Sequence, residues 1–173
     1  NLASEGYLPP FPALHGLSYA ALRYANVYGP RQDPHGEAGV VAIFTRRLLN
    51  GEPVRINGDG RQTRDFVYVR DVSEANARAL VSPAIGSFNV GTGTETDINT
   101  IFSILKRLTG SDVPAQHGPG LAGEQQRSVV DPRAIAATMG WKPTTDLETG
   151  LEATVSSFWA QPAPRPPVPA PPG

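Results

Sequence analysis

One arginine of this chain has the right neighbours to hold a phosphate group. Arg64 follows a Gly-Asp-Gly turn at residues 58–60 and precedes the apolar run of residues 66–69. That run contains only β-branched and aromatic side chains, which predicts a strand with Arg64 at its mouth. A guanidinium group is permanently charged and can hold two phosphate oxygens in a planar fork. An arginine beside a turn is more often a solvated surface residue, so the residue types alone leave both interpretations open.

An asparagine at the end of a second predicted strand is the next candidate. Residues 18–24 have the composition of a strand, and Asn26 comes shortly after them. Open α/β sheets bind their ligands at the carboxyl ends of strands, and a carboxamide offers both a donor and an acceptor there. An asparagine that only starts a turn is an equally good interpretation, because Gly29 and Pro30 follow.

The elements that must position these residues alternate between strands and helices, which is the pattern of an α/β protein. Apolar spacing predicts helices over residues 40–48, 72–81, 98–108, 132–139 and 147–158, and strands over residues 53–57 and 87–90. We expect Asp71 and Asp97 to cap the helices that follow them. Gly110 and Gly140 are expected to end two of the helices. Residues 117–123 are interpreted as a loop.

The segment Gly91-Thr92-Gly93 has the first two glycines of a dinucleotide-binding fingerprint but lacks the rest of it. The third glycine would fall at Thr96, and no acidic strand end follows at the required distance. We interpret this segment as a tight connection between a strand and a helix.

Both ends of the chain carry prolines that limit regular structure. Residues 2–14 begin with types that favour a helix, but Pro9, Pro10 and Pro12 interrupt the pattern. Residues 161–173 contain almost no bulky apolar side chains, so we expect a disordered, extended tail. The chain starts with Asn1 instead of methionine, which suggests a piece of a longer protein.

Composition argues against several other classes of protein. The 173 residues carry a net charge of −1 and include no cysteine. We therefore expect no nucleic-acid partner, no membrane span and no disulfide framework, as in a cytoplasmic protein. His15, His35 and His117 lie far apart without ligand spacing, so no metal site is expected.

Three stretches together resemble a known family. They are residues 22–31, residues 58–72 and the closing segment 124–143, which ends in a Gly-Trp-Lys-Pro turn. They resemble the extended short-chain dehydrogenase/reductases that act on nucleotide-diphosphate sugars, a family that includes the UDP-glucose 4-epimerases. The resemblance implies the C-terminal half of a Rossmann-type α/β fold, with a small mixed α/β substrate-binding subdomain. It covers residues 1–160.

The resemblance also assigns roles to individual residues. It implies that Tyr24 and Ala25 bind the cofactor NAD, and that Ala25 contacts the nicotinamide through its backbone. It implies a nucleotide-sugar site formed by Asn26, Val40, Val41, Arg55, Ile56, Asn57, Arg64 and Glu124. In the family a second arginine holds phosphate where this chain has Leu121. Arg127 could supply the missing charge, so we add it to the predicted site. A lone arginine here is more often a surface residue, and we expect that Arg127 does not compensate for Leu121.

The catalytic residues of the family are not found in this chain. Neither the glycine-rich fingerprint nor the Tyr-x-x-x-Lys pair is present, and Asn1 stands about where the lysine belongs. The resemblance implies the nucleotide-sugar-binding half of an NAD-dependent 4-epimerase of the UDP-glucose/UDP-galactose type. Such an enzyme acts by transient hydride transfer to NAD, binds NAD mainly with the other half and is a homodimer when complete. We expect this chain alone to be inactive. A 4,6-dehydratase, a decarboxylase or a non-catalytic split-gene fragment are the alternatives.

Overall fold

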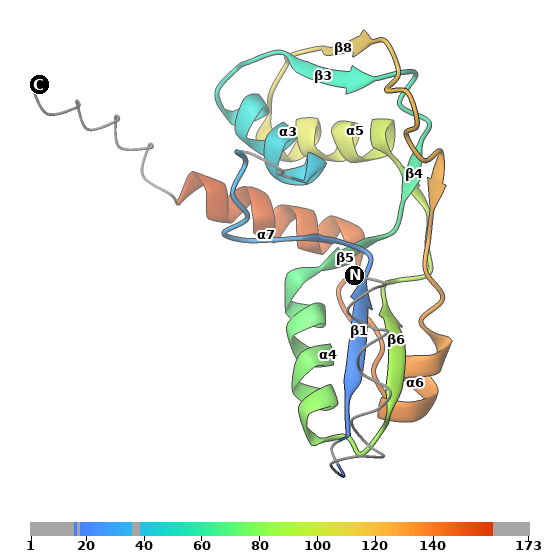
Figure 1. Cartoon of the computed structure of the whole chain (residues 1–173). Helices are drawn as coiled ribbons and strands as arrows, with labels where there is room; N and C mark the ends of the chain where they lie inside the picture. The colour runs from blue at the N-terminus through green and yellow to red at the C-terminus, as the bar shows by residue number, and fades with distance from the viewer. Residues whose placement is uncertain (1–15, 17, 36–38, 161–173) are drawn as a thin grey trace, which may run out of the picture.

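The computed structural model describes residues 16, 18–35 and 39–160. The predicted helix at residues 2–14 and the predicted tail at residues 161–173 lie outside the described residues. The described chain forms two packed groups of elements, joined by short strands (Figure 1). Among the described residues, no helix is long and apolar enough to cross a membrane.

The first group is built on a pair of parallel strands. Strand β1 (Ala20–Tyr24) pairs with β6 (Gly86–Val90). Figure 1 shows this pair between helix α4 (Val69–Val81) and the short helix α6 (Arg133–Met139). A core of Val67, Val90, Ile135 and Trp141, each 0% exposed, holds the group together. Burial of such large apolar surfaces is the main driving force for this packing.

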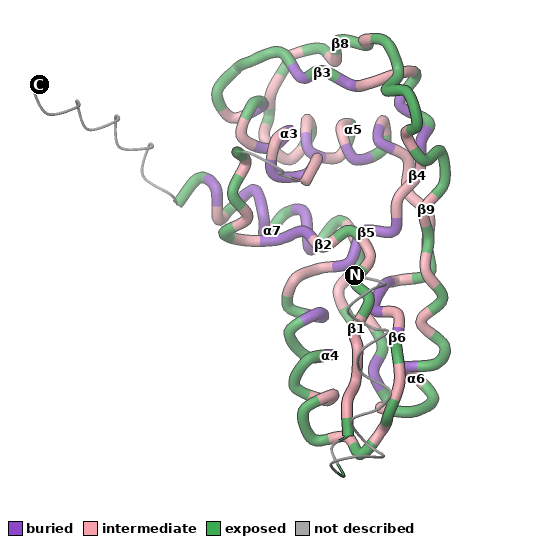
Figure 2. The backbone as a smooth tube through the Cα atoms, viewed as in Figure 1, coloured by how far each residue is buried: buried purple, intermediate pink, exposed green. Residues whose placement is uncertain are grey.

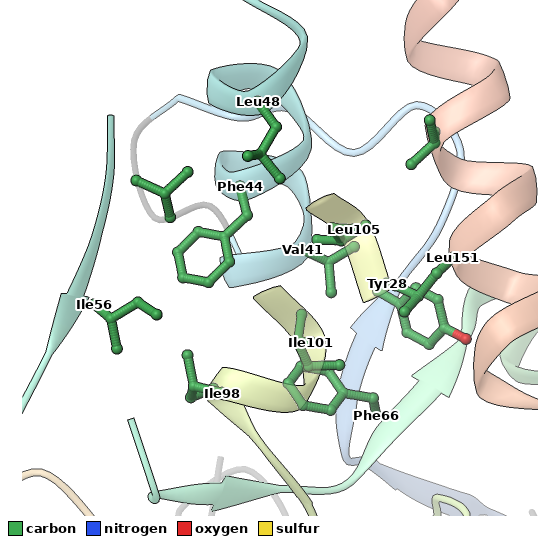
Figure 3. Packing of buried hydrophobic residues seen from close by; sticks show 12 residues of the cluster. Tyr28, Val41, Phe44, Leu48, Ile56, Phe66, Ile98, Ile101, Leu105 and Leu151 are labelled. Atoms are coloured by element: carbon green, nitrogen blue, oxygen red, sulfur yellow. The ribbon is translucent and has the colours of Figure 1, made fainter. Parts of the chain in front are cut away.

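The second group places two helices under another parallel pair of strands. Strands β3 (Val54–Asn57) and β8 (Ala115–Gly118) pair in parallel. Beneath them lie helices α3 (Val40–Leu49) and α5 (Ile98–Thr109), followed by α7 (Leu147–Trp159) (Figure 1). Figure 3 shows how Phe44, Ile101, Leu105 and Leu151 converge from these helices. Figure 2 shows the buried residues on the inner faces of the same helices.

Five very short strands connect the two groups. Strand β2 (Asn26–Tyr28) pairs in parallel with β5 (Phe66–Tyr68). Strand β4 (Thr63–Arg64) lies between β7 (Thr96–Asp97) and β9 (Arg127–Ser128), antiparallel to the first and parallel to the second. The predicted phosphate-binding arginine therefore lies in the central strand of this small sheet.

Tyr28, the last residue of β2, packs between the connecting strands and α7. Its ring is 2% exposed, and its hydroxyl donates to the carbonyl of Leu147 over 3.3 Å. Burial, followed by the nearby charges of Tyr68, Asp146 and Asp71, raises the pKa of Tyr28 well above its ordinary value. The hydroxyl therefore remains a protonated donor at any physiological pH.

Most predicted elements are confirmed with shifts of a few residues at their ends. Helix α5 begins as expected, because the Asp97 carboxylate accepts a hydrogen bond from the Thr100 amide. It ends at Gly110, where φ is +65°, a conformation that suits a residue without a side chain. Gly140 ends α6 in the same way with φ of +64°.

Two expectations about local structure are wrong. Helix α4 begins at Val69, so Asp71 lies inside its first turn and does not cap it. The Asp71 side chain is 2% exposed and accepts hydrogen bonds from the Thr144 and Thr145 amides instead. The predicted loop at residues 117–123 begins with the last residues of β8, because that segment pairs with β3.

Candidate functional site

Arg64 and Glu124 meet although 60 residues separate them in the chain. The Arg64 Nη2 donates to Glu124 Oε1 over 3.2 Å, and Nη1 donates to the carbonyls of Thr63 at 2.8 Å and Gln125 at 2.7 Å. The two charged side chains are 17% and 20% exposed. Arg64 is therefore held in a defined position, and the interpretation as a solvated surface arginine is wrong. We call these two residues the Arg64–Glu124 pair.

The register of β4 against β9 brings the pair together. Arg64 stands beside Ser128 in this parallel ladder, and the Thr63 amide donates to the Gln126 carbonyl over 2.8 Å. The residues just before β9 are thereby drawn alongside Arg64. A turn in which the Glu124 amide donates to the Leu121 carbonyl over 3.2 Å then directs Glu124 toward the guanidinium.

Asn26 lies where the chain changes from one sheet to the other. The Ala25 amide donates to the Val90 carbonyl over 2.9 Å, the last bond to the first sheet. The Asn26 amide donates to the Asp65 carbonyl over 2.8 Å, in the direction of β5. Asn26 is exposed and stands opposite Phe66 in the ladder. The structure therefore brings Asn26 to a strand that directly follows Arg64, at the carboxyl ends of β1 and β6.

Asp65 is a buried carboxylate that the sequence reasoning did not single out. It is 1% exposed and accepts hydrogen bonds from the Thr92 amide at 2.8 Å, the Thr92 hydroxyl at 2.7 Å and the Gly93 amide at 3.0 Å. An acidic residue beside an apolar strand run was the available signal, since a charge in such a place needs several partners. Its contacts show that the amides of the Gly91-Thr92-Gly93 turn are already occupied by an anion of the protein itself.

The side chain of Tyr24 turns toward α4. Its hydroxyl donates to Asn76 Oδ1 over 2.8 Å, and the ring is 46% exposed. It borders an open groove of about 400 Å³ that Tyr19, Leu22 and Leu80 also line. The predicted contact of Tyr24 with a cofactor would therefore fall to its backbone, at the end of β1.

The remaining predicted nucleotide contacts divide into core and surface residues. Val41 and Ile56 are each 1% exposed and point into the core (Figure 3), so a nucleotide contact at either position would fall to the backbone. Val40 is only partly buried. Arg55 is exposed, and its side chain covers Gly118. A Cβ built on Gly118 would lie 2.7 Å from the Arg55 Nε. The Asn57 carbonyl accepts from Gln62 Nε2 over 3.0 Å.

Arg127 does not join the Arg64–Glu124 pair. It stands beside Thr63 in the ladder, and because side chains alternate along a strand, it faces the side of the sheet opposite Arg64. There it donates to the Glu95 carboxylate over 3.0 and 2.6 Å, with its own side chain 78% exposed. Hydrogen bonds from Arg127 and then Thr63 lower the pKa of Glu95 to about 2. Arg127 therefore does not reach the Arg64–Glu124 pair in this structure, in line with the expectation that it does not replace the charge missing at Leu121.

Within the described part of the chain, no three side chains of the types that bind metals gather in one place. Arg64, Glu124 and Asn26 offer the candidate site one guanidinium, one carboxylate and one carboxamide. This set suits recognition of a phosphorylated polar ligand, because it offers a cation, an acceptor and a mixed donor and acceptor.

Comparisons with known proteins identify the family of this chain. The model of the NAD dependent epimerase/dehydratase family matches residues 2–91. A putative UDP-glucose 4-epimerase of Methanocaldococcus jannaschii is 45% identical over 152 residues, which are 88% of this chain and 49% of that protein. The UDP-glucose 4-epimerase of Mycolicibacterium smegmatis is 45% identical over 161 residues, which are 91% of this chain and 51% of that protein.

Solved structures show the same relationship. The UDP-glucose 4-epimerase of Thermotoga maritima, solved with UDP-glucose, superposes with a TM-score of 0.89 at 48% identity, over 92% of this chain and 52% of that one. The chain belongs to the NAD dependent epimerase/dehydratase family. The predicted fold class, part of a Rossmann-type extended short-chain dehydrogenase/reductase, is confirmed. The chain spans about half the length of the curated relatives it matches.

Proposed function

We propose that this chain is the nucleotide-sugar-binding part of an NAD-dependent 4-epimerase of the UDP-glucose type, with residues 1–160 forming that part. The observation that carries the proposal is the Arg64–Glu124 pair beside Asn26. In a nucleoside diphosphate the ribose is attached directly to the first phosphate. A cation for the phosphate and a carboxylate for the ribose hydroxyls are therefore needed within the length of one ligand, and Arg64 and Glu124, 3.2 Å apart, are close enough to supply both.

The donors of Arg64 support this assignment. Described residues use three of its five N–H groups, namely the Thr63 and Gln125 carbonyls and the Glu124 carboxylate. Two N–H groups remain, which is the number a two-point grip on phosphate oxygens requires. Because the protein carbonyls already fix the guanidinium, a ligand would lose little affinity to ordering this side chain.

NAD is proposed to lie mainly against a part of the protein outside this chain. When bound, it supplies the acceptor and donor of hydride for transient oxidation of the sugar. The turn at residues 91–93 does not fit its diphosphate, because the Thr92 and Gly93 amides already hold Asp65. We propose that the backbones of Tyr24 and Ala25, at the end of β1, are this chain's contribution to the nicotinamide site. A homodimer and a cytoplasmic location stay predictions for the complete protein.

The experiment compares Arg64→Ala with Arg127→Ala. Both variants remove an arginine from the same small sheet, but only Arg64 lies next to Glu124. Titration of UDP-glucose by calorimetry should show Arg64→Ala weaker by about 1.5–3 kcal/mol, the scale of a hydrogen bond to a charged group. Arg127→Ala should bind as the unchanged chain does. Equal losses in both variants, or none in Arg64→Ala, would refute the assignment.

A further inference from the structure

The Asp65 carboxylate is fully buried beside the candidate site, yet the proposed function gives it no contact with a ligand. Its hydrogen bonds from the Thr92 amide, the Thr92 hydroxyl and the Gly93 amide are 2.7–3.0 Å long. A fourth donor, the amide of Val130, lies 3.5 Å from Oδ2. A buried charge is stable only when it has such partners, and the partners are in turn fixed by it.

These contacts join three segments that surround the candidate site. Thr92 and Gly93 belong to the turn after β6, and Val130 follows β9, the strand that brings Glu124 to Arg64. The backbone carbonyl of Asp65 accepts from the Asn26 amide over 2.8 Å. One residue therefore links the end of β6, the exit of β9 and the start of β2.

The space around the carboxylate leaves no room for adjustment. A Cβ added at Gly91 would overlap Val130 and the Asp65 carboxylate, and it would approach the Ala25 Cβ to 3.0 Å.

The small sheet itself cannot hold Arg64 firmly, since β4 has only the two residues Thr63 and Arg64. A strand this short forms few ladder bonds, so its position depends on contacts outside the ladder.

We propose that Asp65 is a positioning residue for nucleotide-diphosphate binding. It fixes the backbone of Arg64 relative to Glu124 and Asn26, and so aims the free N–H groups of the guanidinium at the diphosphate. The proposal rests on the proposed function for the identity of the ligand. The position of Arg64 can nevertheless be measured without any ligand.

The central variant is Asp65→Asn, with Asp71→Asn as a matched control. Asp71 is also a buried carboxylate, 2% exposed, and it accepts from the Thr144 amide, the Thr144 hydroxyl and the Thr145 amide. Each variant keeps the size of the side chain and replaces one acceptor oxygen by an NH₂ group. The control therefore shows how much binding changes when a buried carboxylate is replaced that has no hydrogen bond to the described residues around Arg64.

The first readout is the affinity for UDP compared with uridine, which lacks the phosphates. Asp65→Asn should lower the UDP affinity by about tenfold or more, because this is the loss expected when a charged hydrogen bond to the phosphates is no longer made. It should change the uridine affinity by less than about twofold, because uridine offers Arg64 no phosphate. Asp71→Asn should leave the ratio of the two affinities unchanged. A loss of both affinities by the same factor in Asp65→Asn would mean a general folding defect and would overturn the proposal.

The second readout is the proton exchange rate of the Arg64 guanidinium in the ligand-free chain, followed by NMR and assigned with Arg64→Lys. Loosened contacts with Glu124 and Gln125 should raise this rate in Asp65→Asn and leave it unchanged in Asp71→Asn. If the unchanged chain binds no UDP, the proposed function fails, and the exchange rate still decides whether Asp65 positions Arg64. An unchanged rate in Asp65→Asn would overturn the proposal.

A milder variant covers the case in which Asp65→Asn does not fold. Thr92→Val removes the 2.7 Å hydroxyl donor to Asp65 and keeps the backbone donor in place. It should shift both readouts in the same direction as Asp65→Asn but by a smaller factor. Thr92→Val with an unchanged UDP-to-uridine ratio and an unchanged exchange rate would count against the proposal.

Discussion

Gly150 in α7 is a position where helix propensity and packing make opposite predictions. Alanine is favoured over glycine by about 1 kcal/mol inside a helix, so propensity alone predicts that Gly150→Ala stabilises the protein. The structure predicts the reverse. A Cβ at this position would overlap the Tyr28 hydroxyl and lie 2.9 Å from its Cζ and 3.1 Å from its Cε2.

The size of the effect follows from how firmly Tyr28 is held. Its ring is 2% exposed and packs against Phe66 and Tyr68 at centroid distances of 6.4 and 5.7 Å. Crowding such a site costs about 1–3 kcal/mol. Loss of the hydrogen bond from Tyr28 to the Leu147 carbonyl adds about 1 kcal/mol, which offsets the gain in propensity. We expect Gly150→Ala to lower the free energy of unfolding by about 1–3 kcal/mol.

Urea unfolding followed by circular dichroism measures this change. Ser156→Ala is the control, because Ser156 is an exposed residue of α7 and its replacement should raise stability by a few tenths of a kcal/mol. Tyr28→Phe combined with Gly150→Ala should recover part of the loss, since the closest atom is then removed. A Gly150→Ala chain as stable as the original, or a double variant that recovers nothing, would show that the packing argument is incorrect.

Two further predictions concern charge. The pKa of Glu95 is lowered from 4.5 to about 2, so its contribution to stability is complete above pH 4.5 and is lost as the pH falls toward 2. Glu95→Gln should therefore make the free energy of unfolding depend less steeply on pH in this window. An equally steep dependence would contradict the lowered pKa of Glu95. Salt should reduce the difference between the two chains, because Arg127 is exposed. Leu121 is 61% exposed in the turn that leads to Glu124, and Leu121→Arg should tighten UDP-glucose binding by about 1 kcal/mol in calorimetry. Adding Arg127→Ala should not alter that gain, and a dependence on Arg127 would show that it reaches the ligand after all.

Local sequence patterns predicted the helices well. They failed where a side chain binds residues that are distant in the sequence. Helix α5 has its own cap at Asp97 and its own stop at Gly110, so nothing outside the segment is needed to locate it. Asp71 has the same residue type as Asp97 and also lies near a helix start. Its carboxylate instead binds amides 73 and 74 residues further along the chain, which no local pattern can indicate.

The geometry of the candidate site could not be predicted from the sequence. Arg64 and Glu124 were each found from their stretches, yet their contact depends on strands of two residues that show no periodicity. The side on which Arg127 lies is decided by its register beside Thr63. A shift of one residue would have turned Arg127 to the face of Arg64, and composition does not distinguish the two registers.

Several contacts within the described part of this chain hold Arg64 in place. They include the carbonyls of Thr63 and Gln125, the carboxylate of Glu124 and, through Asp65, the turn at residues 91–93. None of these contacts depends on a cofactor or on residues that bind one. If the diphosphate is held as proposed, nucleotide recognition and the redox chemistry of NAD reside in different parts of the protein. Substitutions around Arg64 should then change nucleotide affinity while leaving NAD affinity intact, and the 173-residue chain should bind UDP without catalysing epimerisation.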